Sequence, residues 1–404
     1  MKMCPRCGTE LPDEARFCLS CGAPQEVPTS SQVRVEGSGA IAQEGSVAAG
    51  LSSVAARADV YGDVYIGPPL WDPPKTLRVY RRVLVSACRY LPLRGVDAGA
   101  SDPIGDQQRL SLTQVYVALD TKTQVPLTEE ARQRERRISP WGYETRPLGV
   151  LETTADNRRL VILGDPGAGK STFLNYLALC LATHSLEPEA NWLARLPTWP
   201  EGEADAVPIL IVLRDFSRFL PDGVKKAEPR YLWDFFVSRL EVQNLAFAAE
   251  PLHQILEGGK AIVLLDGLDE IPTRERRTLV RDVVIAFAVR YPRSRVVVTC
   301  RALSYQDPAW QLEGFPVFEL APFDDEKMDR FIEAWYSELA RLGAMREYDR
   351  DVVWQLRMAV RRPDLRRLAS NPLLLTVMAL VHTHKGRLPD ARPLLYEDAV
   401  DILL

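Results

Sequence analysis

The chain lacks several features that would assign it to a familiar class of protein. Its 50 basic residues nearly balance its 54 acidic residues, and the net charge of −4 argues against a protein built mainly to coat nucleic acid. No uninterrupted apolar run approaches the ~18 residues that span a bilayer. The N-terminus has no apolar signal segment. Only four histidines occur, and none belongs to a supported Ser/His/Asp arrangement. The sequence predicts a soluble, cytoplasmic protein with no membrane partner.

Cysteine is unevenly distributed along the chain. Four of the seven cysteines lie within the first 21 residues, and an odd total without a secretion signal does not suit a disulfide framework. The other three, Cys88, Cys180 and Cys300, are isolated in the sequence. We expect these three to be buried thiols.

The N-terminal cysteines form two Cys-x-x-Cys knuckles, each followed by a glycine. Cys4 and Cys7 make the first knuckle, and Cys18 and Cys21 make the second. Four thiolates suit tetrahedral Zn²⁺ and leave no open position for catalysis. The spacing predicts a structural zinc ribbon over residues 1–25, similar to the short ribbons at bacterial protein termini. A redox dithiol is the alternative, but the thioredoxin-like context is missing.

Residues 26–68 are poor in bulky side chains and carry small apolar groups every six or seven residues. One interpretation is a Gly/Ala/Ser/Val-rich linker. The other is a short stack of strand-and-turn rungs, each burying its apolar pair against the next. The repeated groups are Ala40–Ala42, Val47–Ala49, Val54–Ala56, Val60–Tyr61 and Val64–Tyr65.

The rest of the chain divides into three parts. Residues 69–150 look globular, with a helix-to-strand or strand segment at Arg109–Leu119 and a charged helix at Glu129–Arg137. In residues 151–322 short apolar runs alternate with helical segments, which predicts a parallel sheet buried on both faces. Residues 323–404 have helical patterns only, with Asp324 or Asp325 as a helix N-cap. The apolar runs are Leu160–Leu163, Val207–Leu213, Ala261–Leu265 and Arg295–Thr299, and the helical patterns are 324–340, 352–360 and 372–382.

A complete phosphate-binding pattern follows the first apolar run and opens a helix. Glycines let backbone amides converge on phosphate oxygens, and the helix points its positive end at the same anion. Lys170 would reach the β- and γ-phosphates, Ser171 would bind Mg²⁺, and Thr172 would support the α-phosphate. The residues expected to bind nucleotide here are Gly164, Asp165, Pro166, Gly167, Ala168, Gly169, Lys170, Ser171 and Thr172.

An acidic motif at the end of the third apolar run would complete the nucleotide site. Asp266 emerges at the carboxyl end of that run, where α/β sheets bind ligands, and its carboxylate would hold Mg²⁺. Asp269 and Glu270 would orient or deprotonate the attacking water, with Asp269 ranked first. No Asn/Thr-Lys-x-Asp sequence that reads guanine follows at a suitable distance, which favours ATP over GTP.

The sequence Asp266-Gly267-Leu268-Asp269-Glu270 resembles the NACHT family of signal-transduction ATPases, a branch of the AAA+-related switch proteins. Pro208–Arg214 resembles that family's second core strand. Val296–Arg301 resembles its sensor strand, which implies that Arg301 reaches the γ-phosphate. Asn371-Pro372-Leu373-Leu374 resembles the start of a helix in the adjoining helical domain, which implies that Pro372 packs on adenine.

The resemblance covers roughly residues 145–404, and residues 70–145 resemble more weakly the extension that precedes the phosphate loop in many bacterial members. Two departures stand out. The family normally continues into a winged-helix domain, whereas this chain stops at Leu404, so we expect the arm that closes the resting state to be missing or to lie beyond this fragment. A polar, Pro-rich insertion at Glu187–Glu203 is expected to be a surface loop.

These observations predict an α/β fold: a parallel-sheet P-loop NTPase core followed by a helical domain, with a small N-terminal zinc ribbon. The resemblance implies a slow ATP-hydrolysing molecular switch in bacterial signalling or defence, which forms homo-oligomers when active. Its partner would be an unidentified protein trigger or effector. A nucleic-acid-binding regulator timed by ATP hydrolysis and a continuously cycling remodelling ATPase are the alternatives. ATP, Mg²⁺ and Zn²⁺ are the expected cofactors.

The zinc assignment predicts one Zn²⁺ per chain, bound independently of nucleotide. Because so small a unit cannot fold on its own apolar core, removal of the metal should unfold the ribbon while ATP affinity stays nearly constant. Metal analysis of the purified, untagged chain measures this. A zinc content well below one per chain, or full retention in Cys18→Ser/Cys21→Ser, would contradict the assignment.

Overall fold

The computed structural model describes residues 2–3, 10–11, 48–50, 53–55, 73–91, 110–126, 145–224, 226–344, 350–389 and 392–403. The chain divides into two compact units, Met1–Trp71 and Asp72–Leu404. The zinc-ligand cysteines Cys4, Cys7, Cys18 and Cys21 lie outside the described residues, as does the helix expected at 129–137.

Among its described residues, the first unit contains two short antiparallel strand pairs. β1 (Lys2–Met3) pairs with β2 (Glu10–Leu11), and β3 (Ala48–Gly50) pairs with β4 (Ser53–Ala55). The second pair falls on two of the small apolar repeats. The other repeats lie outside the described residues, so both interpretations of residues 26–68 stay predictions.

The second unit is built on a five-stranded parallel sheet with the order β11–β7–β10–β9–β8. The apolar runs expected to form a buried parallel sheet do so, and β9 and β10 are buried almost completely. Because β10 lies between β7 and β9, the residues that follow these three strands meet at one edge of the sheet. The strands are β7 (Arg159–Leu163), β8 (Val207–Val212), β9 (Ala261–Asp266), β10 (Arg295–Cys300) and β11 (Val317–Glu319).

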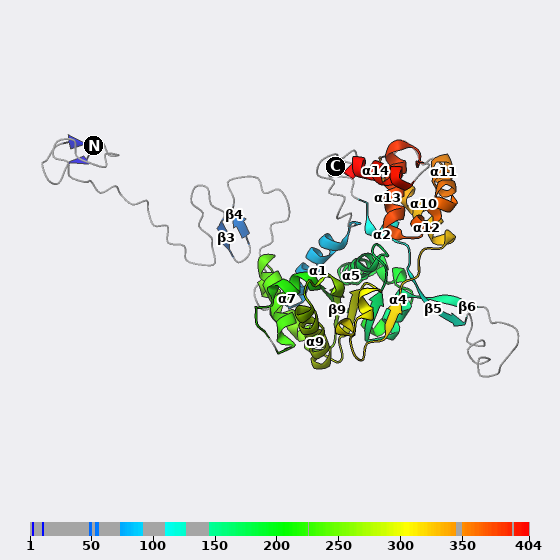
Figure 1. Ribbon diagram of the computed structural model, residues 1–404. Helices are drawn as coiled ribbons and strands as arrows, with labels where there is room; N and C mark the ends of the chain where they lie inside the picture. The colour runs from blue at the N-terminus through cyan, green and yellow to red at the C-terminus, as the bar shows by residue number, and fades with distance from the viewer. Residues whose placement is uncertain are drawn as a thin grey trace. The chain divides into compact units, whose positions relative to one another are not determined.

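Helix α5 (Lys170–Leu186) packs against β8 and β9, and α1 (Pro73–Cys88) packs against α5 (Figure 1). The sequence predicts that the phosphate loop opens an amphipathic helix, but nearly every residue of α5 from Phe173 to Thr183 is buried, so this helix is apolar on nearly all sides. The three isolated cysteines are buried free thiols, as predicted. The other core helices are α4 (Val150–Asp156), α6 (Leu213–Phe219), α7 (Arg230–Val242), α8 (Ala249–Glu257) and α9 (Arg274–Arg290).

The C-terminal part of the second unit is helical, as predicted (orange and red in Figure 1). Asp324 caps the first of these helices, since its carboxylate accepts a hydrogen bond from the N–H of Lys327 at 2.8 Å. No helix in the described part of the chain is long and apolar enough to cross a membrane. The helices are α10 (Asp325–Arg341), α11 (Arg350–Val360), α12 (Pro363–Ala369), α13 (Pro372–Lys385) and α14 (Arg392–Leu403).

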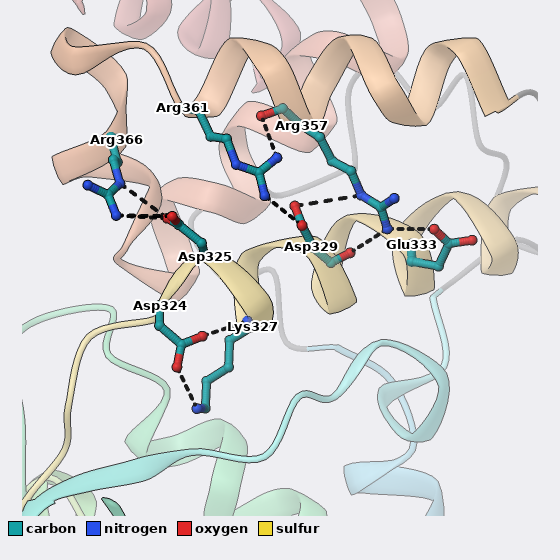
Figure 2. A network of polar contacts seen from close by, with 8 residues as sticks. All are labelled: Asp324, Asp325, Lys327, Asp329, Glu333, Arg357, Arg361 and Arg366. Atoms are coloured by element: carbon teal, nitrogen blue, oxygen red, sulfur yellow. Dashed lines mark hydrogen bonds and ion pairs between the residues drawn. The ribbon is translucent and has the colours of Figure 1, made fainter. Parts of the chain in front are cut away.

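A seam of ion pairs joins α10 to α11 and α12 (Figure 2). The acids of α10 in this seam are spaced four residues apart, which puts them on one face of the helix. Their partners are three arginines, one on α11, one directly after α11 and one on α12, which follow in the opposite chain direction. Asp325 pairs with Arg366 at 3.0 Å, Asp329 with Arg361 at 2.6 Å, and Glu333 with Arg357 at 2.6 Å.

The segment before the core differs in detail from the sequence-based expectation. A single helical turn, α2 (Leu112–Val115), leads into an irregular stretch at residues 116–119. Strand structure begins only at β5 (Asp120–Pro126), which pairs with β6 (Thr145–Gly149). The helical part of the helix-to-strand interpretation is therefore confirmed, but no strand forms within Arg109–Leu119, and the all-strand interpretation is wrong. Buried and less buried residues alternate along 115–119 as in a strand, but the described residues provide no neighbouring strand there.

The insertion at Glu187–Glu203 is also more than the surface loop that we expected. It contains short 3₁₀ turns, and Leu196 and Trp199 within it are buried. Glu203 pairs with the buried Arg295 of β10 at 2.5 Å. Two apolar anchors and one buried ion pair therefore fix this polar segment to the core.

Arg295→Ala should destabilise the second unit by about 3 kcal/mol, because it removes the buried partner of Glu203 and leaves two backbone carbonyls without their donor. Arg295 is 6% exposed and also donates to the carbonyls of Thr154 and Asn157 at 2.7 and 2.9 Å. The matched control is Arg158→Ala, since Arg158 is 54% exposed and lies 3.4 Å from the same Glu203. The control should change stability by less than about 1 kcal/mol. Urea denaturation measures both, and equal effects would contradict the prediction.

Candidate nucleotide-binding site

The phosphate loop occupies the turn between β7 and α5. Gly167 and Gly169 have φ angles of 77° and 91°, in the left-handed region that glycine adopts most readily. Gly169 is also the N-cap residue of α5, and its carbonyl accepts a hydrogen bond from the N–H of Phe173 at 2.8 Å. The helix N-terminus therefore opens directly onto the loop, the arrangement that binds phosphate in other proteins.

Lys170 folds back over the loop. Its Nζ donates hydrogen bonds to the carbonyls of Gly164 at 2.8 Å and Asp165 at 3.0 Å. Burial lowers the pKa of Lys170 below its ordinary value, while the nearby carboxylates of Asp269 and Asp266 act in the opposite direction. Within the described residues, no carboxylate forms an ion pair with this ammonium. A partly buried cation held by neutral carbonyls is suited to an anionic ligand.

Asp266 is the last residue of β9, and its position depends on β10. The hydroxyl of Thr299 donates to Oδ1 of Asp266 at 2.6 Å and accepts from the N–H of Gly267 at 2.9 Å. Thr299 is fully buried, and this double contact fixes both the carboxylate and the turn after it. The sequence analysis included Thr299 in the sensor strand but gave it no role. The register of β10 between β7 and β9 is the information that identifies it.

Asp269 and Glu270, which the sequence treats as a pair, have different surroundings. Oδ1 of Asp269 accepts the N–H of Arg301 at 2.9 Å, and Oδ2 lies 2.8 Å from Nε of the same arginine. The Asp269 side chain is only 5% exposed. The Glu270 side chain is 39% exposed, with Nη1 of Arg214 3.5 Å from its Oε2. Asp269 is therefore engaged on both oxygens, whereas Glu270 has only a long contact with an exposed arginine.

These residues line one cavity of about 260 Å³. The polar part of the lining consists of the phosphate loop and of Asp266, Asp269, Glu270, Thr299 and Arg301. The other part of the lining is mainly apolar and includes Pro372, the first residue of α13. Pro372, which the sequence predicts at the nucleotide site, lines the cavity, but no sequence pattern predicts the remaining apolar lining, which comes from segments far apart in the chain. The apolar side chains missed are Leu91, Val115, Val117, Leu119, Phe323 and Phe331.

Ser171 and Asp266 both line the cavity, so a hydroxyl and a carboxylate are available beside the phosphate loop. This donor set suits Mg²⁺, which usually takes one or two carboxylates together with phosphate oxygens and waters. Among the described residues, no group of three or more His, Cys, Asp or Glu side chains could hold a metal ion. The four cysteines expected to bind zinc are outside that set.

Comparison with known families gives one match. A zinc-ribbon domain model matches residues 3–25, the part of the chain that contains the four knuckle cysteines. Nothing among the curated proteins matches the chain. Together with the parallel sheet, the phosphate loop and the helical C-terminal part, the zinc-ribbon match confirms the predicted fold class.

Solved structures resemble the chain at low identity. PCH-2 of C. elegans is 14% identical, with a TM-score of 0.33 over 68% of this chain and 65% of that one. Domain III of the Thermotoga maritima replication initiation protein DnaA is 18% identical, with a TM-score of 0.30 over 63% of this chain and 87% of that one. The Thermotoga maritima RuvB Holliday junction branch migration motor is 11% identical, with a TM-score of 0.30 over 62% and 66%. The match thus spans slightly less than two thirds of the PCH-2 chain, and the fold assignment rests on the sheet and loop of this chain itself.

Proposed function

We propose that this chain binds ATP with Mg²⁺ and hydrolyses it slowly as a NACHT-type molecular switch. The observation that carries the proposal is the cation of Lys170, which is partly buried, bonded among the described residues to loop carbonyls, and part of a cavity lined by both acidic and apolar side chains. A nucleoside triphosphate has matching parts: an apolar base, a chain of phosphates, and a magnesium ion on those phosphates.

The cavity gives the nucleotide one direction. The base would lie at the apolar end, against Pro372 and the side chains of the 115–119 segment. The phosphates would lie on the loop, where Lys170 would exchange its bonds to neutral carbonyls for charge-assisted bonds to phosphate oxygens. Magnesium would lie between Ser171 and Asp266. The absence of a guanine-reading sequence supports ATP over GTP as the nucleotide.

For hydrolysis we assign the water-orienting role to Glu270, which reverses the order ranked from the sequence. A general base needs a carboxylate oxygen free to accept a proton from water. Both oxygens of Asp269 are occupied by Arg301, so Asp269 is better suited to holding that arginine. Arg301 is half exposed and would turn toward a γ-phosphate, a doubly charged competitor for its guanidinium.

The switch function also rests on sequence resemblance. The run from Asp266 to Glu270 and the run from Asn371 to Leu374 resemble NACHT motifs and occur at two walls of the same cavity. A difference in affinity for two conformations is all that nucleotide binding needs to shift the population. We extend the proposal to homo-oligomers in the active state, a cytoplasmic location and a role in bacterial signalling or defence.

The test of the proposed function is Lys170→Ala. Loss of the ammonium removes charge-assisted bonds to phosphate, so ATP affinity should fall by about tenfold to a hundredfold. Isothermal titration calorimetry with Mg²⁺ and ATP measures it. The matched control is Lys260→Ala, since Lys260 is exposed and precedes β9 at the opposite end from Asp266. Parental affinity in Lys170→Ala would refute the nucleotide site.

Glu270→Gln and Asp269→Asn should separate the two acids. Glu270→Gln should retain ATP binding and slow hydrolysis by about 10²-fold or more, because the proton acceptor is lost. Asp269→Asn should slow hydrolysis less and lower thermal stability, because it weakens a largely buried contact with Arg301. Phosphate release under saturating ATP measures the rates. A parental rate in Glu270→Gln would overturn this assignment of roles.

A further inference from the structure

The start of α13 is hydrogen-bonded to the phosphate loop. Asn371 is the N-cap residue of α13, and its Oδ1 accepts from the N–H groups of Leu373 and Leu374 at 3.1 and 3.3 Å. The Nδ2 of Asn371 donates to the carbonyl of Pro166 at 2.8 Å. The N–H of Leu373 also donates to the carbonyl of Gly167 at 3.1 Å. Asn371 and Pro166, which are 205 positions apart in the sequence, are therefore joined directly, and we call this contact between α13 and the loop the joint.

The joint uses an atom that the helix itself does not need. Aspartate, serine and threonine cap helices through a side-chain oxygen about as well as asparagine does. The amide nitrogen of Asn371 is therefore not explained by capping, and its partner in the structure is the loop carbonyl. The hydrogen bond from Nδ2 therefore indicates that Asn371 also has a role in the loop.

The two surfaces fit closely at Gly167. A Cβ atom at this position would lie 2.7 Å from Oδ1 of Asn371 and 2.7 Å from Cβ of Leu373. Such a separation is well inside van der Waals contact, so a larger residue would force the loop and helix apart. The close approach shows that the hydrogen bonds join packed surfaces.

Holding a carbonyl also orients the amide that follows it. The peptide unit is planar and trans, so its C=O and N–H point in opposite directions. The bond from Asn371 to the Pro166 carbonyl therefore directs the N–H of Gly167 to the other side of the loop. The next peptide is held at both ends, since the Gly167 carbonyl accepts from Leu373 and the N–H of Ala168 donates to the carbonyl of Asp165 at 3.1 Å.

We propose that Asn371 is a positioning residue that presets the phosphate loop for its anion and ties loading of the loop to docking of α13. This inference rests on the proposed nucleotide site and adds a residue to it. Pro372, Leu373 and Thr376 of the same helix line the cavity, so a bound nucleotide contacts α13 directly as well as through the loop. Ligand and joint therefore stabilise each other, because each orders the groups that the other needs.

The test is Asn371→Ser, which retains a capping oxygen and removes the amide donor. Its thermal midpoint without nucleotide should stay close to that of the parent. Its ATP affinity should fall about fivefold to tenfold, the effect of losing one neutral hydrogen bond. The backbone amides of α13 should also lose the protection from hydrogen exchange that ATP gives them in the parent. A capping role alone would not produce this change.

The matched control is Thr273→Ala, which removes the cap of α9. The Thr273 hydroxyl accepts from the N–H of Arg276 at 3.3 Å, and Thr273 is not among the residues that line the cavity. This variant should have a lower thermal midpoint and parental ATP affinity. If Asn371→Ser does not fold, Asn371→Thr provides a second hydroxyl cap for the same comparison.

The outcomes separate the inference from the proposed function. Parental ATP affinity and parental exchange in Asn371→Ser, with loss of binding in Lys170→Ala, would overturn the role of Asn371 and leave the nucleotide site in place. A parent chain that does not bind ATP would overturn both. Weaker ATP binding at unchanged stability, with α13 no longer protected by ATP, is the result that supports the inference.

Discussion

Parallel pairing of β10 between β7 and β9 is the constraint on which the candidate site depends. Cys300 lies opposite Leu163, and Val298 lies opposite Leu265, so the three strands end at nearly the same level. The phosphate loop, the Thr299–Arg301 turn and the acidic turn after Asp266 are therefore brought to one edge without any direct pairing of β7 with β9. Because all three strands are buried on both faces, moving one of them would disturb the core as well as the site.

Two cations at this edge, Lys170 and Arg301, have different partners. Lys170 is bonded to neutral carbonyls, whereas Arg301 is neutralised by Asp269. Within the described residues, a phosphate bound as we propose would meet an ammonium with no ion pair to break, but it would have to compete for the guanidinium. The first contact and the second therefore differ in energetic cost, and only a ligand that reaches both positions would experience the difference. This asymmetry is what a site needs if it is to distinguish a longer phosphate chain from a shorter one.

The sequence was most informative where local chemistry decides the structure. Apolar runs predicted β7, β8, β9 and β10, and glycine spacing predicted the loop at Gly164–Ser171, because both depend on near neighbours in the chain. The short β11 was not predicted, since its residues are exposed or only partly buried. The sequence was least informative where distant segments meet: the apolar part of the cavity lining combines Leu91 with Phe331, and no local pattern joins them. The same reason explains why we propose a different order for Asp269 and Glu270 than the sequence does, since the contact of Asp269 with Arg301 exists only once β9 and β10 are paired. Glu187–Glu203 is a further example, because its polar composition predicts an exposed loop, although Leu196 and Trp199 within it are buried.

The ion-pair seam of the helical part has a consequence for sliding motion. Its acids recur every four residues on α10, and two of its arginines have the same spacing, since Arg357 lies on α11 and Arg361 directly follows the last residue of that helix. A displacement of α11 by one helical turn, about 5.4 Å, would bring Arg361 to Asp325 and Arg357 to Asp329. Arg357 already lies 3.6 Å from Asp329 through its Nε. The matched spacing therefore gives α11 a second, discrete position in which these charges would again be paired, while the burial of its apolar face selects the observed position.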